Sequence, residues 1–392
     1  MYVSSTQQER RRAELARRKW RITLQIALVL FAIVGYMVVS EGSGTRFQML
    51  PALQTEAAST RLILDATTDS DRVLIGGEQG HILYSDDNGT TWTHAQVPVS
   101  LAITAVAFSD SHTAWATAHD GVLLRSIDHG QSWQTNLTGV DIARMSVDAA
   151  EEKVRQLQAE IEQAEPESLE DLEWALDDAQ FAVEDASAVI DEGVTTPLLD
   201  VWFENDRSGY ALGAYGVLLH TSDGGTTWQL LSDRLDNPDN YHLYGVARSA
   251  SGTLLVAGEA GTLLRSRDSG ASWDRPESPY QGSFFGIVAA QDGSFLTFGL
   301  RGNVFRSTDE GDSWVRVDTG DDRTLLAGTV RSNGNIVLVG SAGAVLSSND
   351  NGASFEAIST SGNRVYSGVT ETTEGNLMLV GFGGVSVIDG MN

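Results

Sequence analysis

The 392-residue chain contains no cysteine, only 7 prolines and only two lysines, Lys19 and Lys153. The absence of cysteine excludes disulfides, zinc–thiolate sites, thiol nucleophiles and a lipidated N-terminal cysteine. Basic side chains are also scarce, 26 against 53 acidic ones, and the formal charge of −27 argues against a nucleic-acid partner because phosphate binding needs a basic surface. Glycine is abundant at 40 residues, and 41% of the chain is hydrophobic, so the composition indicates a folded protein with many tight turns.

The first 40 residues predict a membrane anchor. Residues 1–21 carry seven basic and two acidic side chains, a net charge of +5, and residues 22–40 contain no charged side chain. At ~1.5 Å per residue this apolar run spans about 28 Å, close to the hydrocarbon core of a bilayer. The basic flank predicts a cytoplasmic N-terminus, so we expect a single-pass transmembrane helix in a bacterial inner membrane, with the remaining chain in the periplasm. A cleaved signal peptide is the alternative, although its apolar region is usually about 7–15 residues long.

One eight-residue motif recurs six times with the pattern Ser/Thr-x-Asp-x-Gly-x-Ser/Thr-aromatic. Its aspartates are Asp87, Asp128, Asp223, Asp268, Asp309 and Asp350, and its aromatic residues are Trp92, Trp133, Trp228, Trp273, Trp314 and Phe355. Successive aspartates are separated by 41, 95, 45, 41 and 41 residues. A Gly-x-x-Gly pair (Ala118 and Gly121 in one copy) precedes each motif, and a seventh pair, Gly381 and Gly384, follows the sixth after 41 residues. Seven units with one period indicate a repeat architecture.

Each unit contains four short strand-like runs, which are typical of a propeller blade. We therefore predict an all-β, seven-bladed β-propeller, with its closing strand and first two blades in residues 44–140 and its last five blades in residues 194–392. The seventh unit offers only three runs, so we expect residues 46–53 to supply its missing outer strand. Pairing the two ends in this way would close the ring and remove open sheet edges.

The recurring motif is the one known as the Asp-box or bacterial neuraminidase repeat. We expect it to form the turn between the third and fourth strands of each blade, where Asp and Ser/Thr side chains bond within the turn and glycine takes a left-handed conformation. Calcium loops are the alternative for acidic copies such as SDDNG, but no bidentate glutamate recurs at a fixed offset. The motif therefore predicts a fold, and no metal site.

The 95-residue gap exceeds one period by 54 residues and locates an insertion at residues 141–193. Its apolar residues recur with 3-4 spacing over residues 147–164 and again over 169–190, which predicts an antiparallel pair of helices. Ser168 is the expected N-cap of the second helix. Residues 141–192 hold 17 acidic and 3 basic side chains, so this hairpin carries a net charge of −14.

Propeller geometry places the Gly-x-x-Gly turns and the connections between blades on one face, opposite to the Asp-boxes, and we expect the hairpin to rise from this face. Large or charged residues at exposed turn tips favour a binding surface. The candidates for partner binding are Tyr215, Leu300, Arg301 and Phe382 on the turns, and Glu165, Glu167, Glu170 and Asp171 at the hairpin tip. The alternatives are that the turn residues plug the central channel and that the hairpin packs flat on its own propeller.

Catalysis finds little support in the sequence. Asp-box propellers include sialidases and other glycosidases, but this chain lacks the Arg-Ile-Pro motif of sialidases. Glu78, Asp120 and Glu259 are expected on the face that a two-carboxylate site would need, with roughly 5–10 Å between the carboxyl groups. The 7 histidines show no spacing typical of a nucleophile–base pair. We expect a non-enzymatic protein without a cofactor, and a carbohydrate-binding or glycosidase-like propeller is the alternative.

The paired motifs, for example GEAGTLLRSRDSGASW from Gly258 to Trp273, resemble the photosystem II stability/assembly factor family of seven-bladed propellers. The resemblance covers roughly residues 44–389 without the insertion. It implies a non-enzymatic protein that binds membrane-protein assembly intermediates on the extracytoplasmic side. Photosynthetic members share an Arg-lined patch and lack an acidic hairpin, whereas this chain carries 19 basic and 51 acidic side chains after residue 21.

The function we expect is therefore that of a membrane-anchored periplasmic scaffold for an integral inner-membrane complex. Related bacterial proteins are often encoded beside exporters of the resistance–nodulation–division type. The resemblance thus suggests an exporter of lipids or other hydrophobic substrates as the specific partner.

Overall fold

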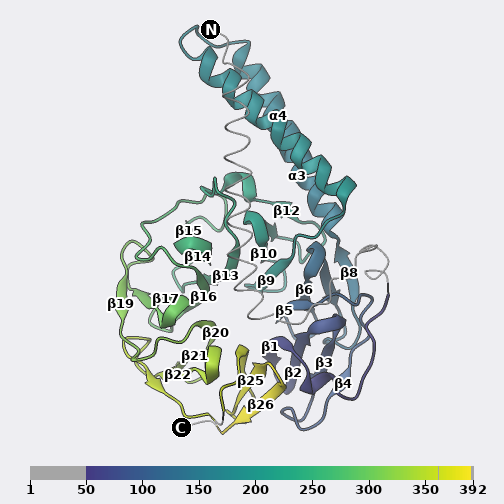
Figure 1. Cartoon of the computed structure of the whole chain (residues 1–392), viewed down its shortest axis with the longest axis vertical. Helices are drawn as coiled ribbons and strands as arrows, with labels where there is room; N and C mark the ends of the chain where they lie inside the picture. Colours follow the sequence, from purple (N-terminus) through teal and green to yellow (C-terminus); the bar gives the residue numbers. More distant parts are fainter. Residues whose placement is uncertain (1–49, 361, 390–392) are drawn as a thin grey trace. The chain divides into compact units, whose positions relative to one another are not determined.

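The computed structural model describes residues 50–360 and 362–389, and in this part the chain forms seven small antiparallel sheets arranged in a ring (Figure 1). Five sheets have four strands, and the fourth and seventh have three, always paired in chain order. This confirms the prediction of a mostly β protein with seven blade-like sheets. The predicted basic tail, residues 1–21, and the predicted transmembrane helix, residues 22–40, lie outside the described residues. Within the described ranges, no helix is long and apolar enough to cross a membrane.

The blades follow one another along the chain. Blades 1 and 2 consist of β1 (Ile63–Asp69), β2 (Arg72–Gly77), β3 (Ile82–Ser85), β4 (Thr93–His94), β5 (Ile103–Phe108), β6 (Ala114–Ala118), β7 (Leu123–Ser126) and β8 (Gln134–Leu137). Blades 3 and 4 consist of β9 (Leu198–Phe203), β10 (Gly209–Gly213), β11 (Leu218–Thr221), β12 (Gln229–Leu230), β13 (Leu243–Arg248), β14 (Leu254–Gly258) and β15 (Leu263–Ser266). Blades 5 to 7 consist of β16 (Phe284–Ala289), β17 (Phe295–Gly299), β18 (Val304–Ser307), β19 (Val315–Val317), β20 (Leu325–Val330), β21 (Ile336–Gly340), β22 (Val345–Ser348), β23 (Glu356–Ala357), β24 (Tyr366–Glu371), β25 (Leu377–Gly381) and β26 (Gly384–Ile388).

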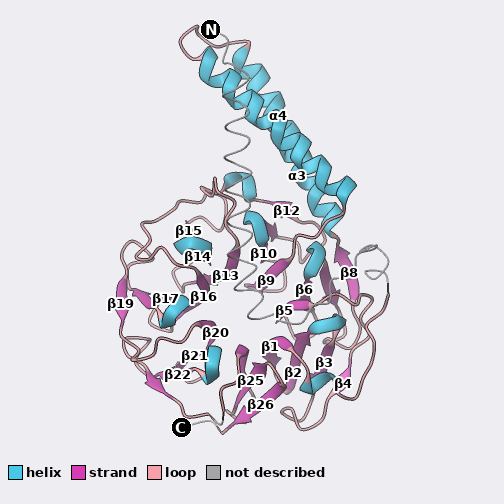
Figure 2. Ribbon diagram, viewed as in Figure 1, coloured by secondary structure: helices cyan, strands magenta, loops and turns pink. Residues whose placement is uncertain are grey.

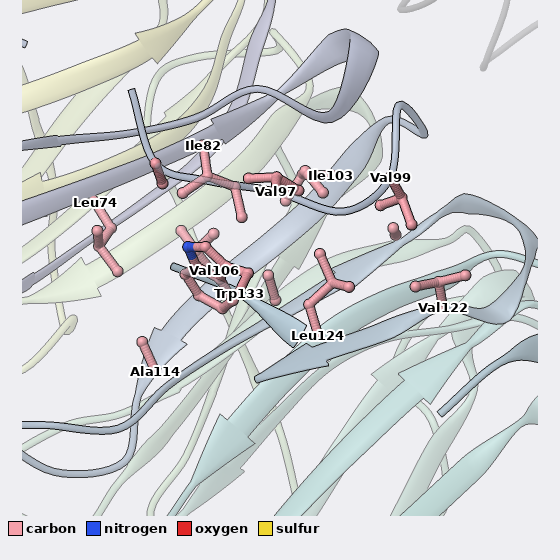
Figure 3. Close-up of a cluster of buried hydrophobic side chains, with 13 residues drawn as sticks. Leu74, Ile82, Val97, Val99, Ile103, Val106, Ala114, Val122, Leu124 and Trp133 are labelled. Atoms are coloured by element: carbon pink, nitrogen blue, oxygen red, sulfur yellow. The ribbon is translucent and has the colours of Figure 1, made fainter. Parts of the chain in front are cut away.

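Neighbouring blades pack face to face through buried apolar side chains. Figure 3 shows the cluster between blades 1 and 2, in which the Asp-box residue Trp133 lies among Leu74, Ile82, Ile103 and Leu124. Trp133 is almost fully buried, and its indole N–H donates to the Gly130 carbonyl at 3.0 Å. The regular spacing of the tryptophans in the sequence therefore reflects their repeated insertion between blades.

The described part of the predicted N-terminal strand, residues 50–53, does not pair with blade 7. Residues 46–49 lie outside the described part, and residues 50–53 are not a strand and do not pair with β26. Pro51 has no N–H that could donate a hydrogen bond to a neighbouring strand. The residues after it bond to blade 1 and to the connection that follows blade 1; the Ala52 N–H, for example, donates to the Val97 carbonyl at 3.1 Å. Among the described residues, blade 1 meets blade 7 where β1 packs on β24, and there the Thr68 and Thr370 hydroxyls lie 2.9 Å apart.

The insertion forms two helices, α3 (Gly139–Ile161) and α4 (Leu169–Glu192), which lie side by side (Figures 1 and 2). The side chains predicted to form the seam between the helices are buried or partly buried, most completely Leu157 and Ala179, while nearly all others are exposed. Ser168 does occupy the N-cap position of α4, but its side chain makes no capping bond and its hydroxyl donates to the Glu165 carbonyl. A full capping box, missed in the sequence, begins α3: Thr138 and Asp141 exchange side-chain and backbone hydrogen bonds.

Candidate interaction surface

The Gly-x-x-Gly turns and the connections between blades share one face of the ring, as predicted; we call it the turn face. Each turn is one turn of 3-10 helix or a tight reversal, and its second glycine has φ between 64° and 84°. A Cβ on this glycine would collide with the backbone of the adjoining connection, for example at Tyr280 for Gly261 and at Gly139 for Gly121. Since Gly139 is the first residue of α3, the hairpin rises from the turn face.

The Asp-boxes cap the opposite ends of the strands and act as turns. In blade 1 the Ser85 hydroxyl donates to the Asp87 carboxylate at 2.7 Å, and the Gly89 N–H donates to the Ser85 hydroxyl at 2.8 Å. The hydroxyl and N–H of Thr91 also donate to Asp87. Such bonds lower the pKa of Asp87, Asp223, Asp268 and Asp350 to about 2. Because the carboxylate oxygens accept hydrogen bonds within the turn, each Asp-box is a structural element.

The Asp-boxes also join neighbouring blades. The residue before the motif's glycine is left-handed, and in several blades its carbonyl accepts a hydrogen bond from the preceding blade. The donors are the guanidinium groups of Arg72, Arg265 and Arg306 and the hydroxyl of Tyr210, and the acceptors are the carbonyls of His129, Glu310, Asn351 and Ser269 respectively. The buried Arg265 also contacts Asp274 and Asp312 at 2.6 and 2.7 Å. Three arginines, Arg72, Arg265 and Arg306, therefore stabilise the packing of neighbouring blades.

The residues predicted to bind a partner are spread over the turn face. Tyr215 is 59% exposed and Phe382 is 40% exposed, while Arg301 is exposed and Leu300 is partly buried. They belong to the turns of blades 3, 5 and 7, so intervening blades separate them. At the hairpin tip Glu165, Glu167, Glu170 and Asp171 are all exposed. The structure brings only Tyr215 of the turn candidates close to the hairpin base, where it and α3 and α4 line one cleft.

Tyr215 is held in an unusual conformation by a histidine from blade 4. Its φ is 57°, and its backbone N–H donates to Nδ1 of His242 at 2.9 Å, while the two rings meet edge to face at 4.9 Å between centroids. The Glu259 carboxylate in turn accepts the His242 backbone N–H at 3.3 Å. Because Nδ1 is the acceptor, His242 is neutral and carries its proton on Nε2. Burial lowers the pKa of His242 to about 4.

Replacing His242 by asparagine should remove part of the acid sensitivity of the fold. The unfolded chain takes up a proton on His242 near its ordinary pKa of 6.5, whereas the folded chain does so only near pH 4. The wild-type free energy of unfolding therefore falls by about 2–3 kcal/mol between pH 7 and pH 4 through this one group. His242→Asn keeps an acceptor for the Tyr215 N–H. Between pH 7 and pH 4 its free energy of unfolding should fall by about 2–3 kcal/mol less than that of the wild type, as measured by urea denaturation across this pH range. An unchanged slope would contradict the neutral, buried histidine.

Two aspartates occupy equivalent places on the innermost strands, a feature that the sequence analysis missed. Asp65 and Asp200 are the third residues of β1 and β9, where the other five blades have Ala105, Gly245, Gly286, Ala327 and Gly368. Asp65 accepts the Val106 N–H of the next blade at 2.9 Å, and Asp200 accepts that of Val246. Burial raises the pKa of Asp65 to about 6 and that of Asp200 to about 7, the latter also through the charge of Asp65. Aligning the seven innermost strands would have found them.

The carboxylates considered for catalysis lie in three different turns. Glu78, Asp120 and Glu259 belong to the turns of blades 1, 2 and 4. Each has a different neighbour: Arg61 at 4.0 Å for Glu78, His119 at 2.7 Å for Asp120, and the His242 N–H for Glu259. In residues 50–360 and 362–389, no three His, Asp or Glu side chains gather closely enough to hold a metal ion.

Known proteins match this chain in the Asp-box repeat and in the propeller fold. Residues 179–320 match the family model described as "Photosynthesis system II assembly factor YCF48", and residues 83–94 match "BNR/Asp-box repeat". The chain is a BNR/Asp-box repeat protein that resembles the YCF48 family. "Photosystem II assembly lipoprotein Ycf48" from Synechococcus sp. (strain CC9902) is 30% identical over 89 residues, which are 21% of this chain and 26% of that protein. The match thus spans about a quarter of the relative's length.

Two solved structures share the fold over most of the chain. "YCF48 bound to D1 peptide" superposes with a TM-score of 0.59 and 16% identity, covering 88% of this chain and 100% of that one. YCF48 from Cyanidioschyzon merolae gives a TM-score of 0.58 and 14% identity, covering 84% and 96%. At these identities the likeness shows the propeller fold alone.

Proposed function

We propose that this protein is a non-enzymatic scaffold that binds an integral membrane complex through its turn face and hairpin. The resemblance to assembly factors in sequence motifs and fold supports this role, as does the relative whose structure is bound to a D1 peptide. The predicted helix at residues 22–40 would anchor the scaffold in a bacterial inner membrane, with the propeller on the periplasmic side. In the described turns Glu78, Asp120 and Glu259 each contact a different neighbour, which gives the glycosidase alternative no specific support.

The observation that carries the proposal is the hairpin. Blades 2 and 3 contact each other directly through β5 and β9, so the ring does not need the insertion to close. The predicted seam residues of α3 and α4 are buried or partly buried, and the exposed surface of both helices is rich in acidic side chains, with Trp174 and Phe181 of α4 also 42% and 47% exposed. An ordered pair of helices of 23 and 24 residues that the ring does not need is typical of a part selected for binding.

Photocrosslinking in intact cells tests the proposal. A photoreactive residue is placed at Glu167 on the hairpin tip or at Phe382 on the turn face, and the control position is Ile127, which is 68% exposed in an Asp-box. We expect adducts with one integral membrane protein from Glu167 and Phe382, and none from Ile127. Equal labelling at all three positions, or no membrane-protein adduct, would argue against the proposal.

A shortened hairpin supplies the functional test. Residues 152–182 are replaced by Gly-Ser-Gly, which leaves in place Ile142 and Met145, because both pack into the core of blades 2 and 3. We expect the partner to be lost from affinity purifications of detergent-solubilised membranes, whereas the melting temperature of the propeller stays nearly unchanged. Full recovery of the partner would contradict a role for the hairpin. The same purification tests the finer prediction of an exporter of the resistance–nodulation–division type.

A further inference from the structure

A cleft lies where the hairpin leaves the ring. Its volume is about 170 Å³, and its walls come from the first turns of α3, the last turns of α4 and blade 3, including Ile142, Ala143, Ala186, Val189, Val194 and Tyr215. None of the lining residues carries a formal charge. An apolar cavity of about 150 Å³ holds a molecule of the size of benzene. The cleft therefore has room for one large apolar side chain.

The exposed wall of the cleft carries an aromatic ring that the other described turns lack at this position. Tyr215 and Val189 are 59% and 39% exposed, so the apolar lining reaches the surface. Tyr215 has the left-handed φ that the equivalent non-glycine residues of the other described turns also have, so its ring and not its backbone distinguishes this turn. Equivalent turns place Gln79, Asp120, Ala260, Arg301 and Ala342 at this position, so no other described turn has an aromatic ring there. His242 fixes the ring beside the cleft through the 2.9 Å hydrogen bond and the edge-to-face contact.

Two carboxylates, Asp191 and Glu192, lie at the end of α4, in the sequence between Val189 and Val194, which both line the cleft. Both are exposed in the last turn of this helix, which contains no basic residue, and they make no ion pair within the described residues. The carbonyl end of a helix already carries a partial negative charge, so two carboxylates there are electrostatically unfavourable. A cation bound at this end of the helix would relieve the repulsion.

We propose that this cleft receives one large apolar side chain from a partner protein whose neighbouring residues are Arg or Lys. The apolar side chain enters between Tyr215 and Val189, and the basic neighbours face Asp191 and Glu192. Arginine has the further advantage that it can stack on the exposed ring of Tyr215. This proposal rests on the proposed scaffold function and adds the chemistry of the segment that the scaffold recognises.

Two photoreactive peptides test the proposal on the full-length chain in detergent. Gly-Ser-Arg-Bpa-Arg-Ser-Gly and Gly-Ser-Glu-Bpa-Glu-Ser-Gly, where Bpa is benzoylphenylalanine, differ only in the charge beside the apolar group. After illumination, mass spectrometry locates the labelled residues. We expect the Arg peptide to label the cleft at least about fivefold more than the Glu peptide, and to lose this advantage in 0.5 M salt. Equal labelling by both peptides, or labelling scattered away from the cleft, would overturn the proposal.

Matched variants separate the cleft from the rest of the hairpin. Ala186→Phe fills the cleft, and Ala188→Phe makes the same change at an exposed position two residues further along α4. Asp191→Asn with Glu192→Gln removes the charge at the end of α4, and Glu160→Gln with Glu162→Gln removes two exposed charges at the far end of α3. We expect about tenfold less labelling for the filled cleft, a severalfold loss for the neutral end of α4, and no change for either control. Circular dichroism confirms that each variant folds, and labelling of Ala186→Phe at the wild-type level would refute the cleft as the site.

The outcomes distinguish this inference from the proposed function. If the shortened hairpin loses its membrane partner while Ala186→Phe retains it, the scaffold function stands and the cleft is not the recognition site. If the Arg peptide labels the cleft but no membrane protein is recovered, the cleft binds peptides and the scaffold proposal fails. A covalent dimer of this chain, or preferential labelling by a photoreactive lipid in nanodiscs, would identify a different occupant and overturn the inference.

Discussion

Gly225→Ala should lower the free energy of unfolding by about 3 kcal/mol or more, because a single methyl group at this Asp-box would be driven into a packed aromatic cluster. Gly225 has φ 75°, and a Cβ there would lie 2.6 Å from Cζ2 of Trp115 and collide with its Cη2. Trp115 is fully buried, stacks on Phe203 at 4.9 Å and meets Trp228 edge to face at 5.6 Å. Because the buried indole has no space to move into, overpacking should cost about 1–3 kcal/mol. The left-handed conformation of alanine should cost roughly a further 1–2 kcal/mol.

Gly320→Ala is the matched control for this prediction. Gly320 has a similar φ of 65°, but a Cβ on it meets nothing within 4 Å, so this variant should lose only the strain of roughly 1–2 kcal/mol. Urea denaturation with an unchanged m-value measures both losses. Trp115→Phe removes the colliding part of the indole, so Gly225→Ala should cost less in that background than in the wild type. Equal losses for the two glycine variants would show that the Asp-box glycine is needed for its backbone conformation alone.

The same contact explains why the sequence predicted the blades so well. In each Asp-box the corresponding glycine lies against the second strand of the preceding blade, at Leu74, Trp115, Tyr210, Leu255, Leu296 and Met378. The last of these belongs to blade 7 and meets Gly89 of blade 1, so the closure of the ring repeats the contact made between all other described Asp-boxes and their preceding blades. Because one contact recurs at six of the seven interfaces between blades, it leaves a period in the sequence that can be read directly.

Features that occur once leave no such period. The N-terminal segment was predicted to complete blade 7 because that blade lacks a fourth strand. In its described part, however, the backbone makes hydrogen bonds with blade 1: the His94 ring bonds to the backbone of Thr55, and the His81 ring to the carbonyl of Leu53. Apart from Pro51, which disfavours a paired strand, nothing in the local pattern of residues 50–57 distinguishes the two outcomes. The choice depends on two histidines that lie 28 and 39 residues further along the chain.

The candidate site was predictable only in part for the same reason. Tyr215 was recognised as an exposed turn residue, since its place in the Gly-x-x-Gly motif is local information. Its support by His242, 27 residues away, and the cleft that it forms with both ends of the hairpin come from tertiary packing. The acidic character of the hairpin was visible in the sequence, but the concentration of apolar side chains at its base was not, because Ile142 and Val189 lie 47 residues apart.

Asparagine at position 200 should make the fold less sensitive to rising pH. Burial keeps a proton on Asp200 in the folded chain up to about pH 7, whereas the unfolded chain releases it near 3.8. A raised folded pKa stabilises the protein below the unfolded value, and this contribution is lost as the pH rises through the folded one. Relative to the wild type, Asp200→Asn should therefore gain about 4 kcal/mol in the free energy of unfolding between pH 4 and pH 8. Asp65→Asn should gain about 2–3 kcal/mol over the same range, since its folded pKa is about 6.

The pH-dependent part of this difference is the quantity to measure, because asparagine also changes the hydrogen bonds to Val201 and Val246 by an amount that does not vary with pH. Asp71→Asn, which makes the same substitution at an exposed position between β1 and β2, provides the matched control. The double variant should gain less than the two single gains combined, because removing the charge of Asp65 lowers the pKa of Asp200 towards its ordinary value. A flat difference for Asp200→Asn would mean that the carboxylate is ionised in the folded ring, and that two charges on the innermost strands are tolerated at neutral pH.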